Sequence, residues 1–422
     1  MLRLERRVWS GILSAVLVAA GYAQTGGSAL TWEQVKSRFR AANPNLKAGE
    51  LNIQESKAQE ITAYLRPNPD VSFGLDQIDF FSGNPYRPFA YTFPSISFSY
   101  LHERQHKREL RLESAQQATA ESQAQLADLE RTLLFNLRTA FVQGLQAKAL
   151  VATAQENLDY FGKQLSINRD RYQAGDIARV DLDRVVLQRV QYESDYQTAQ
   201  VNLRTAKITL LMLLNDRTPV DRFDIAGPFT SADSLPSLDQ LHTEALAARP
   251  DLKAAMLAVQ KAQTDHKLAV ANGSTDPTFG ADFGRNPPIP LYMGVNVSIP
   301  LRIFDRNQGE KARTQIDILH AERQKDAAEA QVFNDVDSAY FTLAGAMNQL
   351  KSYKGADGYL ETASRIRETI SFSFQHGQAA LVDYLDAQRD YRATQVAYLN
   401  LIGSYLIAAG QLNLAVGREV IQ

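Results

Sequence analysis

The chain has 422 residues, 45% of them apolar and 22% charged, so it can form roughly one to three domains with a buried core. Its formal net charge is −2, which argues against a nucleic-acid partner, because phosphates attract a surplus of lysine and arginine. Cysteine is absent, which excludes disulfides, thiolate metal sites, cysteine nucleophiles and a lipid-bearing cysteine, and the composition points away from an enzyme.

The first residues have the pattern of an export signal. The chain begins with positively charged arginines, and an apolar run follows from Val8 to Ala20. The small residues Gly21 and Ala23 then occupy positions −3 and −1 of a cleavage site, so cleavage is predicted after Ala23. The alternative is a membrane anchor, but the run is shorter than the ~20 residues that a spanning helix needs. No later stretch approaches that length of apolar sequence. We therefore expect residues 1–23 to be a signal peptide, and the mature chain to be soluble in a secretory compartment or held in a membrane by β-strands.

The positions of the prolines divide the rest of the chain. All 15 lie in three clusters, Pro44 to Pro94, Pro219 to Pro250 and Pro277 to Pro300. Residues 95–218 and 301–422 contain none, and both stretches are rich in Ala, Gln, Leu, Glu and Arg. Because proline breaks helix interiors and these residues favour helices, the sequence predicts very long helices in both stretches.

Apolar and small residues in the first of these stretches recur in alternating steps of three and four, with one extra step of four. Such a pattern predicts a coiled-coil seam with one local stutter. A helix from about Glu103 to Arg171 would be on the order of 100 Å long, which an ordinary globular helix does not reach. The seam residues are Leu126, Leu129, Leu133, Leu137, Ala140, Gly144, Ala147, Val151, Ala154, Leu158, Phe161 and Leu165.

The chain repeats itself, with matching segments about 202 to 208 residues apart and in the same order. The heptapeptide that starts at Ala42 matches the one at Ala248, and Tyr172-Gln-Ala-Gly matches Phe374-Gln-His-Gly. Each copy reads as helix, strand, strand, very long helix, glycine-centred turn and long helix. The sequence therefore predicts an internal duplication.

The domain boundaries follow from this duplication. We expect a first structural repeat at 24–214 and a second at 239–422, the latter including a C-terminal tail. Residues 215–238 form the only break between the halves that is rich in Pro, Asp and Ser, and they are predicted to be a linker.

Four segments are predicted to be strands, at about 69–77, 89–101, 277–284 and 291–300. Apolar residues alternate in them with small or polar ones, and the second segment changes phase at Pro94-Ser95. Alternation with aromatic residues is typical of transmembrane β-barrels, although a small soluble sheet packed on helices gives the same pattern. The export signal, the duplication and the long helices together favour the barrel. Four strands cannot close alone, so we expect a shared barrel of eight strands in a dimer or twelve in a trimer.

The segment His102-Glu-Arg-Gln-His106 matches the zinc-protease pattern His-Glu-x-x-His. Catalysis is disfavoured because the segment lies in a cationic stretch, no third ligand is apparent downstream, and the repeat partner that starts at Phe304 contains no histidine. A polar collar at the start of the first long helix, where strands become helices, is the preferred interpretation.

These features resemble the TolC family of trimeric outer-membrane efflux channels over nearly all of the mature chain. The most specific ones are the duplicated order of elements, the motif aromatic-x-x-Gly-x-x-x-x-Val-Asp at 172–181 and 374–383, and the run from Ile299 to Gly309. The last is similar to the branch that works with heavy-metal and resistance–nodulation–division (RND) exporters.

The resemblance implies a mainly helical fold with membrane β-structure. Three chains would form a twelve-stranded barrel in the outer membrane of a Gram-negative bacterium and a helical tunnel through the periplasm, with residues 215–238 and the C-terminal tail in an equatorial belt. The chain would be a passive duct for small solutes, without catalytic residues, cofactor or metal. Its partners would be outer-membrane lipid, a periplasmic adaptor and an inner-membrane pump of the RND type.

The resemblance also implies where the adaptor and the gate lie. Asp383 and Asp386 share a helix face and would form a ring of six carboxylates that selects cations at the periplasmic mouth. The first repeat has Arg184 in place of the second acid, and Ala379 replaces a basic gating residue of the family. The alternative for Asp383 and Asp386 is that acids in a first helical turn simply interact favourably with the helix dipole. The alternative for Val180 and Val382 is ordinary core packing. The expected adaptor-docking residues at the two tips are Tyr172, Gly175, Val180, Asp181, Phe374, Gly377, Val382 and Asp383.

A second function from another class stays open: a periplasmic coiled-coil adaptor or structural tether without a pore. An adaptor would have one hairpin flanked by β-rich domains, whereas this chain is predicted to have two hairpins with strands at the opposite ends of the long helices. The cargo cannot be read from the sequence, since metal ions, dyes, drugs and peptides would all pass a wide polar tunnel.

Overall fold

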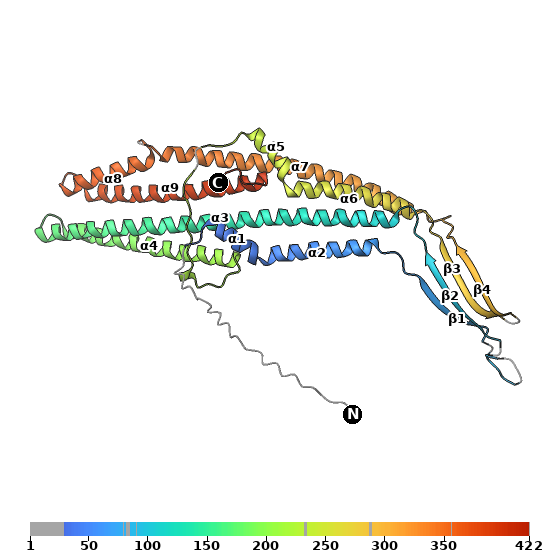
Figure 1. The fold of residues 1–422 in the computed structure, drawn as a ribbon. Helices are drawn as coiled ribbons and strands as arrows, with labels where there is room; N and C mark the ends of the chain where they lie inside the picture. Colours follow the sequence, from blue (N-terminus) through green and yellow to red (C-terminus); the bar gives the residue numbers. More distant parts are fainter. Residues whose placement is uncertain are drawn as a thin grey trace, which may run out of the picture.

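The computed structural model describes residues 29–421 except 79, 82–84, 90, 232–233, 287–288 and 356. The predicted signal peptide at 1–23 lies outside the described residues. The molecule is elongated, with a long helical bundle and a four-stranded sheet that extends from one end of it (Figure 1). This arrangement places the sheet and the tips of the helical hairpins at opposite ends of the elongated molecule (Figure 1).

The first half contains two short helices, two strands and a hairpin of long helices. Helix α3 has 68 residues, which corresponds to about 100 Å of unbroken helix. Its length confirms the very long helix that the absence of proline predicts. The elements are α1 (Trp32–Ala42), α2 (Pro44–Tyr64), β1 (Asp70–Asp76), β2 (Phe93–Leu101), α3 (Lys107–Ala174) and α4 (Arg179–Leu213).

The second half repeats this order with one difference. The helix that corresponds to α3 is broken between Tyr353 and Tyr359, so the expectation of a second unbroken helix was wrong. Gly355 lies in the break with a φ of 96°, a left-handed conformation that interrupts an α-helix. The short helix η1 (Val220–Arg222) lies in the segment that joins the halves, and the elements of the second half are α5 (Leu238–Ala248), α6 (Pro250–Asn272), β3 (Thr278–Asn286), β4 (Ile289–Ser298), α7 (Gln308–Tyr353), α8 (Tyr359–Gln375) and α9 (Leu381–Val416).

Local chemistry sets the same boundaries in both halves. Helices α2 and α6 each begin with a proline directly after a short helix, where the missing N–H costs no hydrogen bond. Asn43 caps α2, because its side chain accepts hydrogen bonds from the backbone N–H groups of Asn45 and Leu46. Helices α3 and α7 both follow a residue in the left-handed conformation, His106 and Asn307 respectively.

The sheet is antiparallel, in the order β1-β2-β3-β4. Strand β2 begins at Phe93 rather than at 89, and it pairs with β1 without a register shift. The predicted change of phase at Pro94-Ser95 therefore lies at the start of the strand rather than inside it. Within the described residues, β1 and β4 each have one neighbouring strand, so each leaves one edge unpaired.

Three apolar clusters hold the helices together. One joins α5, α7 and α9, a second joins α1, α3 and the segment around η1, and a third lies near the tips between the two hairpins. The predicted seam of α3 is buried at Leu137, Phe161 and Leu165, whereas Leu129 is exposed. Gly144 of the seam allows close packing, because a Cβ there would lie 2.6 Å from Cδ1 of the buried Ile225.

Helix α9 contains a window that is long and apolar enough to span a bilayer, contrary to the expectation that no such stretch follows the signal peptide. Half of that window is buried inside the bundle. It packs against α3, α7 and α8, so its apolar character serves the helical core.

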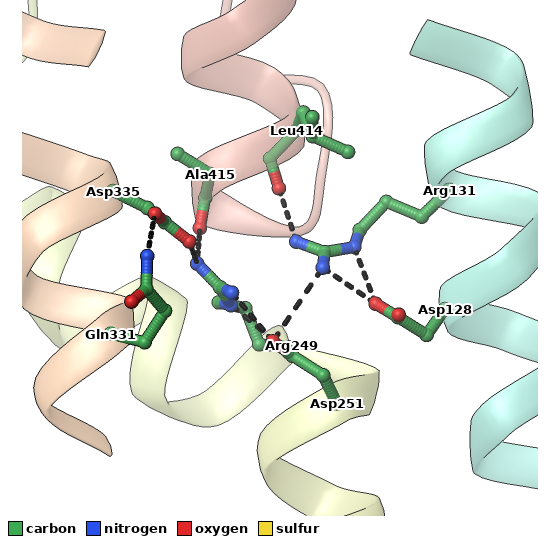
Figure 2. A network of polar contacts seen from close by, with 8 residues as sticks. All are labelled: Asp128, Arg131, Arg249, Asp251, Gln331, Asp335, Leu414 and Ala415. Atoms are coloured by element: carbon green, nitrogen blue, oxygen red, sulfur yellow. Dashed lines mark hydrogen bonds and ion pairs between the residues drawn. The ribbon is translucent and has the colours of Figure 1, made fainter. Parts of the chain in front are cut away.

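A polar network joins the two halves at the C-terminal end of α9 (Figure 2). Arg249, whose side chain is 3% exposed, forms ion pairs with Asp251 at 2.5 Å and with Asp335 of α7 at 2.8 Å. It also donates a hydrogen bond to the carbonyl oxygen of Ala415. A buried guanidinium with two carboxylates and a helix carbonyl is well compensated, and it fixes α6 and α7 against α9.

Arg131 extends this network to α3. It pairs with Asp128 at 2.5 Å and with Asp251 at 3.7 Å, and it donates to the carbonyl oxygen of Leu414 (Figure 2). Burial works against ionisation of Asp251, but the guanidinium of Arg249, helped by Arg131, holds the pKa of that carboxyl below its usual value. The last carbonyls of α9 are thus neutralised by arginines from both halves of the chain.

Candidate functional site

The sheet has one apolar face and one polar face. The register places Phe73 opposite Ile96 and Ala281 opposite Val295, so apolar side chains align across all four strands. This face is exposed in the chain: Phe73 is 81% and Val295 78% exposed. A soluble sheet packed on helices would cover it. An exposed apolar face of this extent therefore suits contact with lipid.

The opposite face is built from small and polar residues. Gly280 and Gly294 lie across from Asn296 and Asp282, and a Cβ on either glycine would approach those side chains to 2.7 Å or less. The glycines therefore leave room for polar groups to lie across the strands. This face includes Ser72, Gly74, Ser95, Ser97, Ser99, Gly280, Asp282, Gly284, Tyr292, Gly294 and Asn296, and the two ends of β2 add Phe93 and Leu101 to it.

Exposed aromatic residues flank the sheet at both ends. Phe81, Tyr86 and Tyr91 belong to the segment between β1 and β2, and Phe304 lies where β4 leads into α7. Aromatic belts at both boundaries of an apolar band are typical of membrane barrels.

The junction of strands and helices holds no zinc-protease site. His102 directly follows β2, and the next helix begins only at Lys107, so the two histidines do not share a helix face. Gln105 and His106 are left-handed, with φ values of 59° and 54°. The expectation that this segment starts the long helix was therefore wrong. Among the described residues there is no group of three or more side chains that could hold a metal ion.

A buried ion pair at this junction was not foreseen from the sequence. Lys107, 3% exposed, lies 2.5 Å from Asp276, and Asp276 also accepts a hydrogen bond from the backbone N–H of Arg104. The pair ties the start of α3 to the segment that enters β3. A lysine in a cationic stretch gives no sequence signal for such a partner.

The two hairpin tips have the same backbone geometry. Gly175 and Gly377 both have positive φ, 86° and 73°. In each tip the N–H of the next residue donates to a carbonyl five residues earlier, Asp176 to Arg171 and Gln378 to Ser373. This is the Schellman arrangement that ends a helix with a left-handed glycine.

The side chains of the tips differ between the repeats. Tyr172 is exposed, whereas its counterpart Phe374 is buried and stacks on Tyr384 with ring centres 4.8 Å apart. Val180 and Val382 are both exposed, so core packing within one chain does not explain the valines. The remaining predicted tip positions are glycines and acids on the same turns.

Asp383 and Asp386 lie together on the exposed face of the first turns of α9, away from the buried Tyr384. Asp386 pairs with Arg389 at 3.2 Å, while Asp383 has no ion pair among the described residues. The face is therefore not purely acidic. In the first repeat, Arg184 lies 3.9 Å from Asp181.

A buried polar layer between the hairpins was missed by the sequence reasoning. The side chain of Gln388 donates to the hydroxyl of Ser371, and Asn157 donates to Gln395 across the two hairpins. Nearby, Arg392 pairs with Asp195 of α4 at 2.8 Å. Polar residues at heptad spacing beside the apolar seam are the signal that could have indicated this layer.

The comparisons with known proteins agree with this architecture. Residues 241–418 match the family model of outer membrane efflux proteins. The cobalt-zinc-cadmium resistance protein CzcC of Cupriavidus metallidurans is 24% identical over 92% of this chain and 90% of its own length. TolC of Escherichia coli is 22% identical over 68% of this chain and 61% of its own length.

Solved structures show the same fold. That of CusC has a TM-score of 0.76 at 17% identity and covers 92% of both chains. That of VceC from Vibrio cholerae has a TM-score of 0.75 at 16% identity, covering 92% of this chain and 96% of that one.

Proposed function

We propose that this chain is a TolC-like outer membrane efflux protein and forms the passive exit duct of a tripartite export system. The observation that carries the proposal is that the two ends of the molecule differ in kind. An exposed apolar sheet face lies at one end, and a pair of helical hairpins reaches about 100 Å away from it at the other. A sheet in the outer membrane would direct the hairpins into the periplasm.

The duct is proposed to be a homotrimer surrounded by lipid. Open strand edges cannot face hydrocarbon, because each unpaired backbone group there costs several kcal/mol. The unpaired edges of β1 and β4 support closure with neighbouring copies, and three chains of four strands would give the twelve-stranded barrel that the resemblance implies. The polar face would then line the lumen.

The proposed partners are a periplasmic adaptor and an inner-membrane pump of the RND type. The support for the heavy-metal branch is the similarity to CzcC over nearly the whole chain. We propose that the adaptor docks on the exposed side chains of the tips, led by Tyr172, Val180 and Val382, and that Asp383 and Asp386 form the cation-selective ring.

We propose no catalytic activity, cofactor or resident metal. The support is that the only protease-like motif, at His102, lies outside the helix that its chemistry would need. Energy for export would come from the pump, since the sequence contains no phosphate-binding loop of the Gly-x-x-x-x-Gly-Lys type.

Conductance in a planar lipid bilayer tests the duct. The purified protein is expected to give stepwise, cation-preferring currents after insertion. A periplasmic tether or adaptor would give none, so protein that inserts or binds without conducting would overturn the proposal.

A further inference from the structure

A cavity of about 380 Å³ lies far from the sheet and the tips, where α1, α3 and the C-terminal end of α9 meet. Its wall includes apolar side chains of Leu134, Phe135 and Ile421 beside the arginines Arg131 and Arg138. The volume is within the range of pockets that hold small organic molecules.

The charge of this wall is unbalanced. Five cationic and two acidic side chains line the cavity. The other cations have carboxylate partners, such as Arg40 with Glu130 at 2.6 Å and Arg418 with Glu244 at 2.5 Å. Arg138 alone has no ion pair and no hydrogen-bond acceptor within the described part of the chain.

Arg138 is also partly withdrawn from water. Its guanidinium carbon lies 4.7 Å from the ring centre of Trp32, and burial lowers the pKa of Arg138 despite the opposing charges of Glu419 and Glu33. The contact with the indole face stabilises the cation but leaves the N–H donors of the guanidinium unpaired. Because Arg138 is only half-buried, these N–H donors remain accessible from the cavity and can bind an added anion.

We propose that this cavity binds a small organic anion, whose carboxylate pairs with Arg138 and whose apolar body packs against Leu134, Phe135 and Ile421. The proposal is independent of the duct, because none of these residues belongs to the tips or the sheet. The apolar wall favours an organic carboxylate over a bare inorganic oxyanion.

Fluorescence of the tryptophan beside the cavity can report binding. It has two tryptophans, and Trp9 lies in the predicted signal peptide, so the mature protein should report from Trp32 alone. The trimer in a nonionic detergent is titrated with 4-phenylbutanoate, with its neutral amide 4-phenylbutanamide, and with inorganic phosphate. Fluorescence is excited at a wavelength where only tryptophan absorbs, and calorimetry detects binding that leaves the emission unchanged.

We expect saturable binding of 4-phenylbutanoate, and affinities at least about tenfold weaker for the amide and for phosphate. Arg138→Gln should weaken binding of the carboxylate by at least about tenfold, while Arg138→Lys should retain part of it. Arg323→Gln on the exposed face of α7 is the matched control and should bind like wild type.

Three results would overturn the proposal. Equal affinity for the amide would show that the charge is not recognised, and unchanged binding by Arg138→Gln would place the anion elsewhere. If the trimer must be dissociated before any anion binds, the cavity is already filled by a second copy of the chain.

Discussion

At the scale of single residues, the two repeats differ in the charge around equivalent acidic positions of the tips. Asp181 has Arg184 within 3.9 Å on its own helix, whereas Asp383 has no cationic partner among the described residues. The identical backbone of the two tips therefore presents different charge. A partner or a permeating ion can distinguish the second hairpin from the first.

The first prediction concerns this acidic pair. Changing Asp383→Asn together with Asp386→Asn should weaken cation selectivity and block by trivalent cations in single-channel recordings, because the proposed ring of six carboxylates would attract multivalent cations. Asp181→Asn, at the equivalent position of the first repeat, is the matched control and should leave both properties unchanged. Wild-type selectivity in the double variant would mean that the ring does not face the lumen.

At the scale of elements, a left-handed glycine ends the first helix of each hairpin and allows the chain to reverse direction. A β-branched residue at positive φ costs roughly 1–2 kcal/mol, and the backbone around it must change to relieve the strain. Apart from their immediate chain neighbours, no atom of the described residues lies within 4 Å of where a Cβ would be on Gly175 or Gly377. Backbone conformation, rather than packing, therefore sets the requirement for glycine.

The second prediction follows from that geometry. Gly175→Val or Gly377→Val should impair adaptor-dependent export, measured as cell survival in the presence of a toxic cargo, without preventing trimer assembly. Gly162→Val is the control, since Gly162 lies inside α3 with open space around it and ordinary helical backbone. Unchanged export in both tip variants would argue against docking at the tips.

The third prediction uses two neighbouring residues of β4 that face opposite ways. Val295→Lys should destabilise the inserted barrel by about 2–4 kcal/mol, because it places a charge on the lipid-facing side. Asn296→Lys, on the polar face, should be tolerated. Folded protein in the outer-membrane fraction measures both, and equal losses would contradict the assignment of the two faces.

The elements that the sequence predicts well depend on local chemistry. Absence of proline predicts α3, alternation predicts the strands, and the glycine motifs predict the tips. The break after Tyr353 was missed because glycines in a proline-free stretch do not by themselves decide whether a helix continues. The start of α3 depends on Lys107 meeting Asp276, and the polar layer on Asn157 meeting Gln395, contacts between residues 169 and 238 positions apart that periodicity cannot show.

At the scale of the whole molecule, the exposed apolar face and the two open edges are unfavourable for an isolated chain in water. Both are resolved at once when copies close a barrel in lipid. Membrane insertion and assembly are therefore expected to be coupled.

The fourth prediction is a heat-modifiable trimer in the outer-membrane fraction. Unheated samples should migrate as a trimer on a denaturing gel and boiled samples as a monomer, because the closed barrel resists detergent until heated. A monomer that remains soluble after removal of the signal peptide would refute the barrel, whether or not the tips bind an adaptor.

The break in the second long helix has a mechanical consequence. Helix α3 is a continuous strut that transmits a push at Gly175 directly to Lys107, at the base of the sheet. From Gly377, the covalent path to the sheet runs through two separate helices, α8 and α7, which end and begin on either side of Gly355. A load applied at the tips would therefore be carried by one unbroken helix in the first repeat and by two shorter helices in the second.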